Sequence, residues 1–149
     1  MHIDGSGSSQ YPAAFPQENV IAVANSTQGD RLSTGSNYGV VSVDIAAPGQ
    51  EVYSTYNDGG YRFLTGTSMS SPMISGALAL VASHDPSLTP LELKQRLLDT
   101  AKRFDSFDGK LVPTRPANPI DRLKPISHQN YQNVLPYPKV AVSTQAELS

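Results

Sequence analysis

The chain has 149 residues, a formal net charge of -2 and no cysteine. This length is sufficient for one domain with a hydrophobic core. The absence of cysteine excludes disulfide bridges and thiolate metal sites, and the charge balance gives no reason to expect nucleic acid as a partner. No apolar run approaches the roughly 18 residues of a membrane-spanning helix. The first residues, Met1 to Gln10, lack the pattern of a signal peptide.

Short apolar runs separated by turn-forming residues predict strands in the first half of the chain. Residues 19–25 form an apolar run bounded by polar residues, which is typical of a buried strand. Alternating apolar residues over 41–45 predict a second strand, which ends at the turn Ala47-Pro48-Gly49 because proline cannot donate to a strand ladder. Residues 52–55 predict another short strand, and 61–64 lead into the segment that follows.

The segment from Ser68 to about Ser83 predicts a helix. It is apolar on nearly every side, which is typical of a buried helix. Pro72 is tolerated near the start of this helix, because the first four N–H groups of a helix have no partner inside it. Gly76, two turns further on, is expected to let the helix pack closely against its neighbours.

A second helix is predicted over residues 86–102. Thr89 is its N-cap, Pro90 takes the first helical position and Glu92 completes a capping box. Leucine residues form one apolar face that packs on the core. The side chains expected to face water are Lys94, Gln95 and Arg96.

The composition changes after Gly109. Half of the chain's 12 prolines fall within residues 113–149, and apolar periodicity is weak there. Such a composition is typical of an extended or disordered segment. We therefore predict a domain over residues 1–112 and a proline-rich extended or disordered tail over 113–149.

The segment Gly66-Thr67-Ser68 combines residue types that suit nucleophilic catalysis. Gly66 lets the backbone turn tightly and lets a substrate chain approach closely. Ser68 begins the predicted helix, whose unpaired N–H groups favour negative charge. If the Ser68 hydroxyl attacks a carbonyl, its own N–H can bind the resulting oxyanion, and such a donor contributes about 3–4 kcal/mol. On these residues alone a simpler interpretation stays open, in which Ser68 is only an N-cap.

The wider sequence around Ser68 resembles the active-site serine signature of the subtilases. In that signature Gly-Thr-Ser-Met is followed by a small residue, a proline, another small residue and a glycine, as over residues 66–76 here. Ala47-Pro48-Gly49 is similar to the family's Ala-Pro-Gly turn, and residues 11–16 are similar to its Tyr-Pro-Ala stretch. The resemblance covers roughly residues 8–110, and it favours the subtilisin branch over the related sedolisins.

This resemblance implies a fold and a reaction. The fold is α/β: a partial subtilisin-like three-layer arrangement with a parallel sheet and flanking helices, incomplete at its N-terminal side. The reaction is serine-type proteolysis through an acyl-enzyme on Ser68, with Thr67 and Gly66 as candidate oxyanion- or substrate-binding residues. In the family a histidine accepts the serine proton and a buried aspartate orients that histidine. The implied partner is a polypeptide substrate, and the implied compartment is extracellular or periplasmic.

The resemblance also implies a weak cation site but no required cofactor. In some family members, carbonyl oxygens of the Tyr-Pro-Ala loop and an Asp just before Ala-Pro-Gly bind calcium or a monovalent ion. Ala13, Phe15 and Asp44 occupy the matching places, and hard cations prefer such oxygen ligands. An Asp44 that simply caps a turn explains the residue equally well.

The sequence departs from the family at the other catalytic positions. The motifs that carry the catalytic Asp and His are absent, and no Asn precedes residue 5 as the side-chain oxyanion donor. His84 closes the predicted helix about 24 Å from Ser68 by the 1.5 Å rise per residue, His2 is near the terminus and His128 is in the tail.

Three hypotheses follow from these departures. The first is a fragment of a serine endopeptidase, inactive in isolation because loss of a triad member costs on the order of 10⁴-fold. Its partner would be the missing N-terminal part of the domain. The second is a degenerate, non-catalytic subtilase that acts as a binding or structural module. The third, a carbohydrate- or peptide-binding β domain unrelated to proteases, requires the match over residues 66–76 to be chance.

Overall fold

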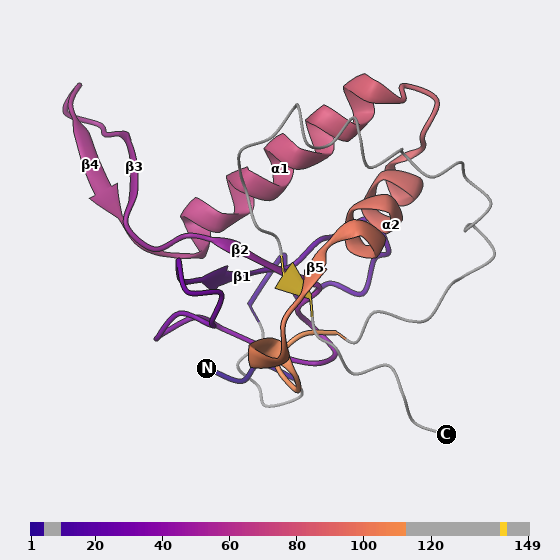
Figure 1. The fold of residues 1–149 in the computed structure, drawn as a ribbon, viewed down its shortest axis with the longest axis horizontal. Helices are drawn as coiled ribbons and strands as arrows, with labels where there is room; N and C mark the ends of the chain where they lie inside the picture. Colours follow the sequence, from indigo (N-terminus) through magenta and orange to yellow (C-terminus); the bar gives the residue numbers. More distant parts are fainter. Residues whose placement is uncertain (5–9, 113–140, 143–149) are drawn as a thin grey trace.

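The computed structural model describes residues 1–4, 10–112 and 141–142. Strands β1 (Val23–Ser26) and β2 (Ile45–Pro48) pair in parallel, with Val23 opposite Ile45. Helices α1 (Thr67–His84) and α2 (Pro90–Thr100) lie together over one face of this sheet (Figure 1). The predicted α/β class, with a parallel sheet and flanking helices, is confirmed.

The sheet continues beyond β2 with two short strands from the second half of the chain. Strand β6 (Ala141–Val142) is antiparallel to β2, and β5 (Lys102–Arg103) is parallel to β6. The strand order is therefore β1-β2-β6-β5, which leaves β1 at the edge among the described residues. The predicted tail lies outside the described residues except for β6, which belongs to the sheet.

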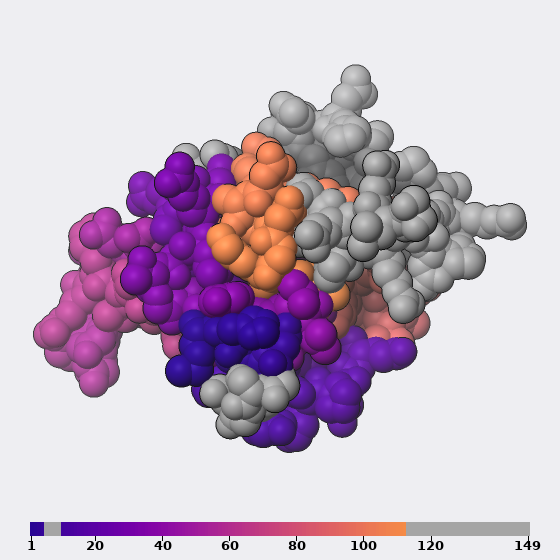
Figure 2. Space-filling view, turned by 90° about the horizontal axis from the view of Figure 1, so that it is seen from below, coloured from indigo at the N-terminus to yellow at the C-terminus, as the bar shows by residue number. Residues whose placement is uncertain are grey.

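Two separate apolar clusters form on the two faces of the sheet because successive residues of a strand point to opposite sides. On the helix side, Ile45 and Ala47 pack with Ile74 of α1 and Leu97 of α2. The opposite face is covered by the N-terminal residues and by the short 3₁₀ helix η1 (Asp105–Phe107) with the loop after it. Its buried residues are Ile3, Ala24, Val43, Ala46, Phe107 and Leu111. Figure 2 shows the N-terminal segment beside residues 102–112 on this lower face.

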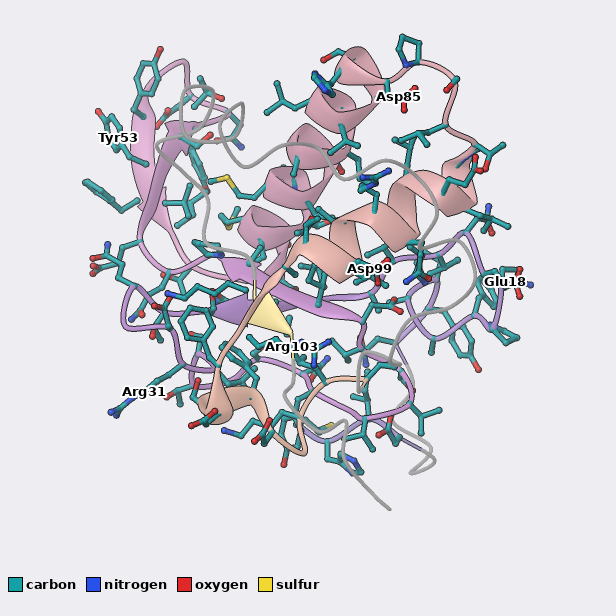
Figure 3. All side chains as sticks on the ribbon, turned by 45° about the vertical axis from the view of Figure 1, so that its right-hand side comes forward. Glu18, Arg31, Tyr53, Asp85, Asp99 and Arg103 are labelled. Atoms are coloured by element: carbon teal, nitrogen blue, oxygen red, sulfur yellow. The ribbon has the colours of Figure 1, made fainter. Side chains whose placement is uncertain are left out.

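A separate two-stranded hairpin projects from the body of the molecule (Figure 1). It consists of β3 (Val52–Thr55) and β4 (Tyr61–Leu64), paired antiparallel. Three aromatic side chains share its outer face, where Tyr53 contacts Phe63 and Tyr61 at centroid distances of 4.9 and 5.5 Å. Figure 3 shows Tyr53 pointing away from the body. At the base, the Glu51 N–H donates to Thr65 Oγ1 over 2.9 Å.

The strand predicted over 41–45 is displaced in the structure. Of the residues 41–45, only Ile45 belongs to β2, and the side chain of Val41 is on the surface, with 77 % of Val41 exposed. The reason is a tertiary contact, since the Asp4 carboxylate accepts hydrogen bonds from the N–H groups of Val41 and Ser42 at 3.1 and 2.9 Å. These bonds hold residues 39–43 in a turn and delay the strand by four residues.

Helix α1 forms where predicted, but it is not buried on all sides. In the described part of the chain only Ser70, Ile74 and Val81 of this helix are buried, and Leu80 is 42 % exposed. One face contacts β1, β2 and α2, and nothing lies within 4 Å of a Cβ placed on Gly76. The expectation of close packing at Gly76 is therefore wrong for the described residues.

The N-cap of α2 is confirmed, although the helix is shorter than the predicted 86–102. The Thr89 side chain accepts from the Glu92 N–H at 3.4 Å, and the Glu92 carboxylate accepts from the Thr89 N–H at 2.7 Å. The expectation that Lys94 faces water is wrong. Its ammonium contacts Asp44 and the Val20 carbonyl oxygen on the sheet side.

Replacing Thr89 by alanine removes the side-chain half of this capping box. We expect Thr89→Ala to lower the free energy of unfolding by about 1 kcal/mol, the usual contribution of an N-cap. Chemical denaturation of both proteins measures the difference. Thr34→Ala, at an exposed position, is the control and should change little; an equal loss in both variants would contradict the assignment of the cap.

The charge of Glu92 makes this stabilisation depend on pH. Hydrogen bonds from the backbone and side chain of Thr89 lower the pKa of Glu92. A carboxyl group whose pKa is lowered by folding stabilises fully above its unfolded pKa of about 4.3, and this contribution disappears as the pH falls through the folded pKa. The difference in unfolding free energy between wild type and Glu92→Gln should therefore shrink between about pH 6 and about pH 3. If the difference in unfolding free energy between wild type and Glu92→Gln does not depend on pH, this prediction is contradicted. Glu18→Gln is the control, and its difference from wild type should not follow the same pH dependence.

Candidate active site

The turn Ala47-Pro48-Gly49 and the segment that begins with Gly66 are brought together in the structure. The Gly66 N–H donates to the Gly49 carbonyl oxygen over 2.8 Å. The backbone of Gly66 is extended, with φ 159° and ψ 169°, and the chain enters α1 at the next residue. Two motifs that are separate in the sequence thus form one junction between the end of β2 and the start of α1.

Ser68 is the second residue of α1 and is exposed to solvent. The Gly66 carbonyl oxygen accepts from the N–H groups of Met69 and Ser70 at 3.0 and 3.4 Å. Within the described part of the chain, the N–H groups of Thr67 and Ser68 have no acceptor. The N-cap is Gly66 and no side chain caps the helix, so the interpretation of Ser68 as an N-cap is wrong.

This geometry favours a negatively charged group in front of Ser68. The unpaired N–H groups and the helix dipole both present partial positive charge at this end of α1. The first turn carries no acidic side chain that would cancel it. The exposed hydroxyl of Ser68 therefore lies beside N–H groups able to bind an oxyanion.

The underside of the junction is a tight contact between Gly49, Ser70 and Asn25. A Cβ built on Gly49 would lie 2.1 Å from Ser70 Oγ, 2.5 Å from the Gly66 carbonyl oxygen and 2.8 Å from Asn25 Oδ1. Ser70 is fully buried and Asn25 is 3 % exposed, and neither of these side-chain oxygens has a hydrogen-bond partner among the described residues. Only glycine at position 49 allows β1, β2 and the first turn of α1 to approach this closely.

Asn25 and Ser70 support the junction, and neither role is predicted from the sequence. The backbone of Asn25 is itself fixed, because its N–H donates to Ser36 Oγ and its carbonyl oxygen accepts from the Ser33 N–H, both at 2.9 Å. The only sequence feature that points to Asn25 is that it is a polar residue at the end of an apolar run. Ser70 gave no signal beyond its place in the motif.

The described histidines do not supply a base beside Ser68. His84 lies in the last turn of α1, about 24 Å along the helix by its rise per residue. His2 Nε2 lies 3.3 Å from the Asp4 carboxylate, and its ring contacts the Tyr38 ring at a centroid distance of 5.4 Å. His128 lies outside the described residues.

The residues expected to bind a cation do not form an open site. Asp44 Oδ2 accepts from the Ala22 N–H at 2.8 Å, and Asp44 Oδ1 lies 3.1 Å from the Lys94 ammonium. No hydrogen bond or ion pair of the described residues joins Asp44 to Ala13 or Phe15. In residues 1–4 and 10–112, no group of three or more His, Cys, Asp or Glu side chains could hold a metal ion. The expected set of residues therefore does not fit a bound cation.

Replacing Gly49 by alanine tests the tight contact directly. The added methyl group would meet three oxygen atoms below 3.0 Å, two of them on the first turn of α1 and the residue before it. We expect Gly49→Ala to lower the free energy of unfolding by about 1–3 kcal/mol, as overpacking usually does.

Gly76→Ala is the matched control, because in the described part of the chain no atom beyond the adjoining helix backbone lies within 4 Å of the new methyl group. This exchange in the middle of a helix should raise the unfolding free energy by about 0.5–1 kcal/mol. Thermal or chemical denaturation compares the two variants. A Gly49→Ala protein as stable as wild type would show that the contact is not tight.

Comparison with known protein families shows to which family this chain belongs. The model of the subtilase family matches residues 2–131, which is most of the chain. The chain belongs to the subtilase family. Subtilisin Savinase of Lederbergia lenta is 39% identical over 102 residues, which cover 68% of this chain and 37% of that protein. Thermitase of Thermoactinomyces vulgaris is 46% identical over 83 residues, which cover 56% of this chain and 29% of that protein.

Solved structures agree with this subtilase assignment. A cold adapted subtilisin-like serine proteinase superposes with a TM-score of 0.61 at 36% sequence identity, covering 68% of this chain and 38% of that one. A further relative, similar in sequence, is the halolysin-like extracellular serine protease Nep of Natrialba magadii. It is 43% identical over 98 residues, which cover 66% of this chain and 18% of that protein. This subtilase chain therefore spans less than two fifths of the length of these relatives. None of its described helices is long and apolar enough to cross a membrane.

Proposed function

We propose that this chain is the nucleophile-bearing part of a subtilase serine endopeptidase, with Ser68 as the nucleophile. The observation that carries the proposal is the exposed Ser68 hydroxyl at the start of α1, beside N–H groups that have no acceptor in the part of the chain that the structure describes. Membership of the subtilase family supports the same conclusion, because the named relatives are proteases.

The proposed chemistry is acyl transfer. The Ser68 Oγ attacks the carbonyl carbon of a peptide bond, and its proton passes to a histidine supplied from outside this sequence. The oxyanion of the tetrahedral intermediate accepts a hydrogen bond from the Ser68 N–H, and the Thr67 hydroxyl is a second candidate donor. Gly66 has no side chain, which leaves space for an extended substrate backbone. When the intermediate collapses, the C–N bond breaks and the histidine gives its proton to the leaving amine. Water then hydrolyses the ester of the acyl-enzyme and restores the Ser68 hydroxyl.

The remaining catalytic groups must come from polypeptide outside these residues. In the described part of the chain β1 is an edge strand, and apolar side chains of α1 such as Leu80 are exposed. Such surfaces suit packing against further strands and helices of the same domain. We propose that the part of the domain carrying the catalytic Asp and His covers them, and that the assembled enzyme is extracellular, as one relative's name states for that protein.

A fluorophosphonate probe tests the nucleophile, because it labels only an activated serine hydroxyl. The isolated 149-residue chain should not be labelled. When the chain is joined to a polypeptide that carries the family's Asp and His, we expect labelling at Ser68, which mass spectrometry of the labelled peptide locates. Ser68→Ala should abolish the label, whereas Ser71→Ala, at an exposed neighbour on the same helix, should retain it.

Two outcomes would overturn this proposal. Labelling of the isolated chain at Ser68 would show that the serine is activated by groups within these residues. A joined protein that folds but is not labelled would favour the non-catalytic binding or structural module.

A further inference from the structure

Lys94 extends from α2 to the start of the parallel sheet. Its ammonium donates to the Val20 carbonyl oxygen at 2.6 Å and lies 3.1 Å from Asp44 Oδ1. The side chains of Lys94 and Asp44 are only 16% and 20% exposed. This ion pair is therefore largely withdrawn from water, unlike an ordinary surface pair.

Asp44 links the two parallel strands at the same point. Its N–H donates to the Ala22 carbonyl oxygen at 3.0 Å, and its Oδ2 accepts from the Ala22 N–H at 2.8 Å. Lys94 adds a third segment, because it binds the other carboxylate oxygen and the carbonyl oxygen of Val20. One positive charge thus holds α2, the residues before β1 and the residue before β2 together.

The ligands of this ammonium are the ligands of a hard metal cation. An ammonium group has three N–H donors and no acceptor, so it requires oxygen atoms around it. A carboxylate oxygen and a backbone carbonyl oxygen are also what calcium and monovalent cations prefer. A second cation at these oxygens would lie within a few ångströms of the ammonium, and like charges at that distance repel strongly.

We infer that the Lys94 ammonium takes the place of a structural cation at Asp44 and the Val20 carbonyl. The wild-type chain binds no calcium, sodium or potassium there, and its stability does not depend on these ions. Removing the ammonium exposes the two oxygens, and the same place then binds a cation. The inference depends on the fold alone and holds whether or not Ser68 is a nucleophile.

The decisive experiment compares thermal unfolding of four 149-residue chains in choline chloride and, at equal ionic strength, in sodium, potassium or calcium chloride. The chains are wild type, Lys94→Met, Lys94→Arg and Lys102→Met. Lys102→Met is the matched control, because it removes the charge of an exposed lysine whose ammonium lies over the Phe104 ring and, among the described residues, forms no ion pair with a carboxylate.

Wild type, Lys94→Arg and Lys102→Met should have a Tm that is the same in every salt. Lys94→Met should melt about 5 °C lower in choline chloride, and part of this loss should return in a saturable manner as one of the metal cations is added. The double variant Lys94→Met with Asp44→Asn should not respond, which would locate the new site at Asp44.

Two results would overturn the inference. One is a saturable rise of the wild-type Tm with a metal cation that Asp44→Asn abolishes. The other is a Lys94→Met chain whose Tm is the same in choline and in every metal chloride. If Lys94→Met does not fold, the ¹⁵N–¹H signal of the Lys94 ammonium in the wild type decides: it should stay unchanged when the cations are added, and its displacement would refute the inference.

Discussion

The structure depends on the close approach of Gly49 to the start of α1. The 2.8 Å hydrogen bond from the Gly66 N–H to the Gly49 carbonyl oxygen joins the end of β2 to the residue that precedes the helix. Ser70 and Asn25 press against the same glycine from the helix and from β1. Because these contacts fix the first turn of α1, the direction of its unpaired N–H groups and the exposure of Ser68 are fixed with it.

The two ends of the parallel strand pair are stabilised in different ways. At the end near Ser68, small residues and backbone hydrogen bonds bring the elements together without charge. At the opposite end, Asp44 and Lys94 form a largely enclosed ion pair that connects both strands to α2. An enclosed ammonium is favourable only when oxygen ligands replace its water shell, and the Asp44 carboxylate and the Val20 carbonyl do so here. The positive charge at this end of the strand pair is thereby part of the chain itself.

The sequence best predicts those features that depend on residues close together in the chain. Thr89 and Glu92 are three residues apart, so their capping box follows from local geometry and was found. The contact of Lys94 with Val20 spans 74 residues, and no local pattern distinguishes this lysine from one that faces water. The strand predicted at Val41 is wrong for the same reason, because the Asp4 carboxylate that accepts from the Val41 N–H lies 37 residues earlier in the chain. Motif resemblance located Ser68 correctly at a helix entry but gave no sign that Asn25 supports it.

The hairpin of β3 and β4 differs from the rest of the molecule in how it is attached. Its strands bond to each other, and the 2.9 Å bond between the Glu51 N–H and Thr65 Oγ1 closes its base before the chain reaches Gly66. Side chains beyond that closure, such as Tyr53 and Phe63, contact one another and are mostly exposed. The outer half of the hairpin can therefore diversify in sequence at little cost to the helix entry, so that evolution can alter this projecting surface while the geometry around Ser68 stays constant.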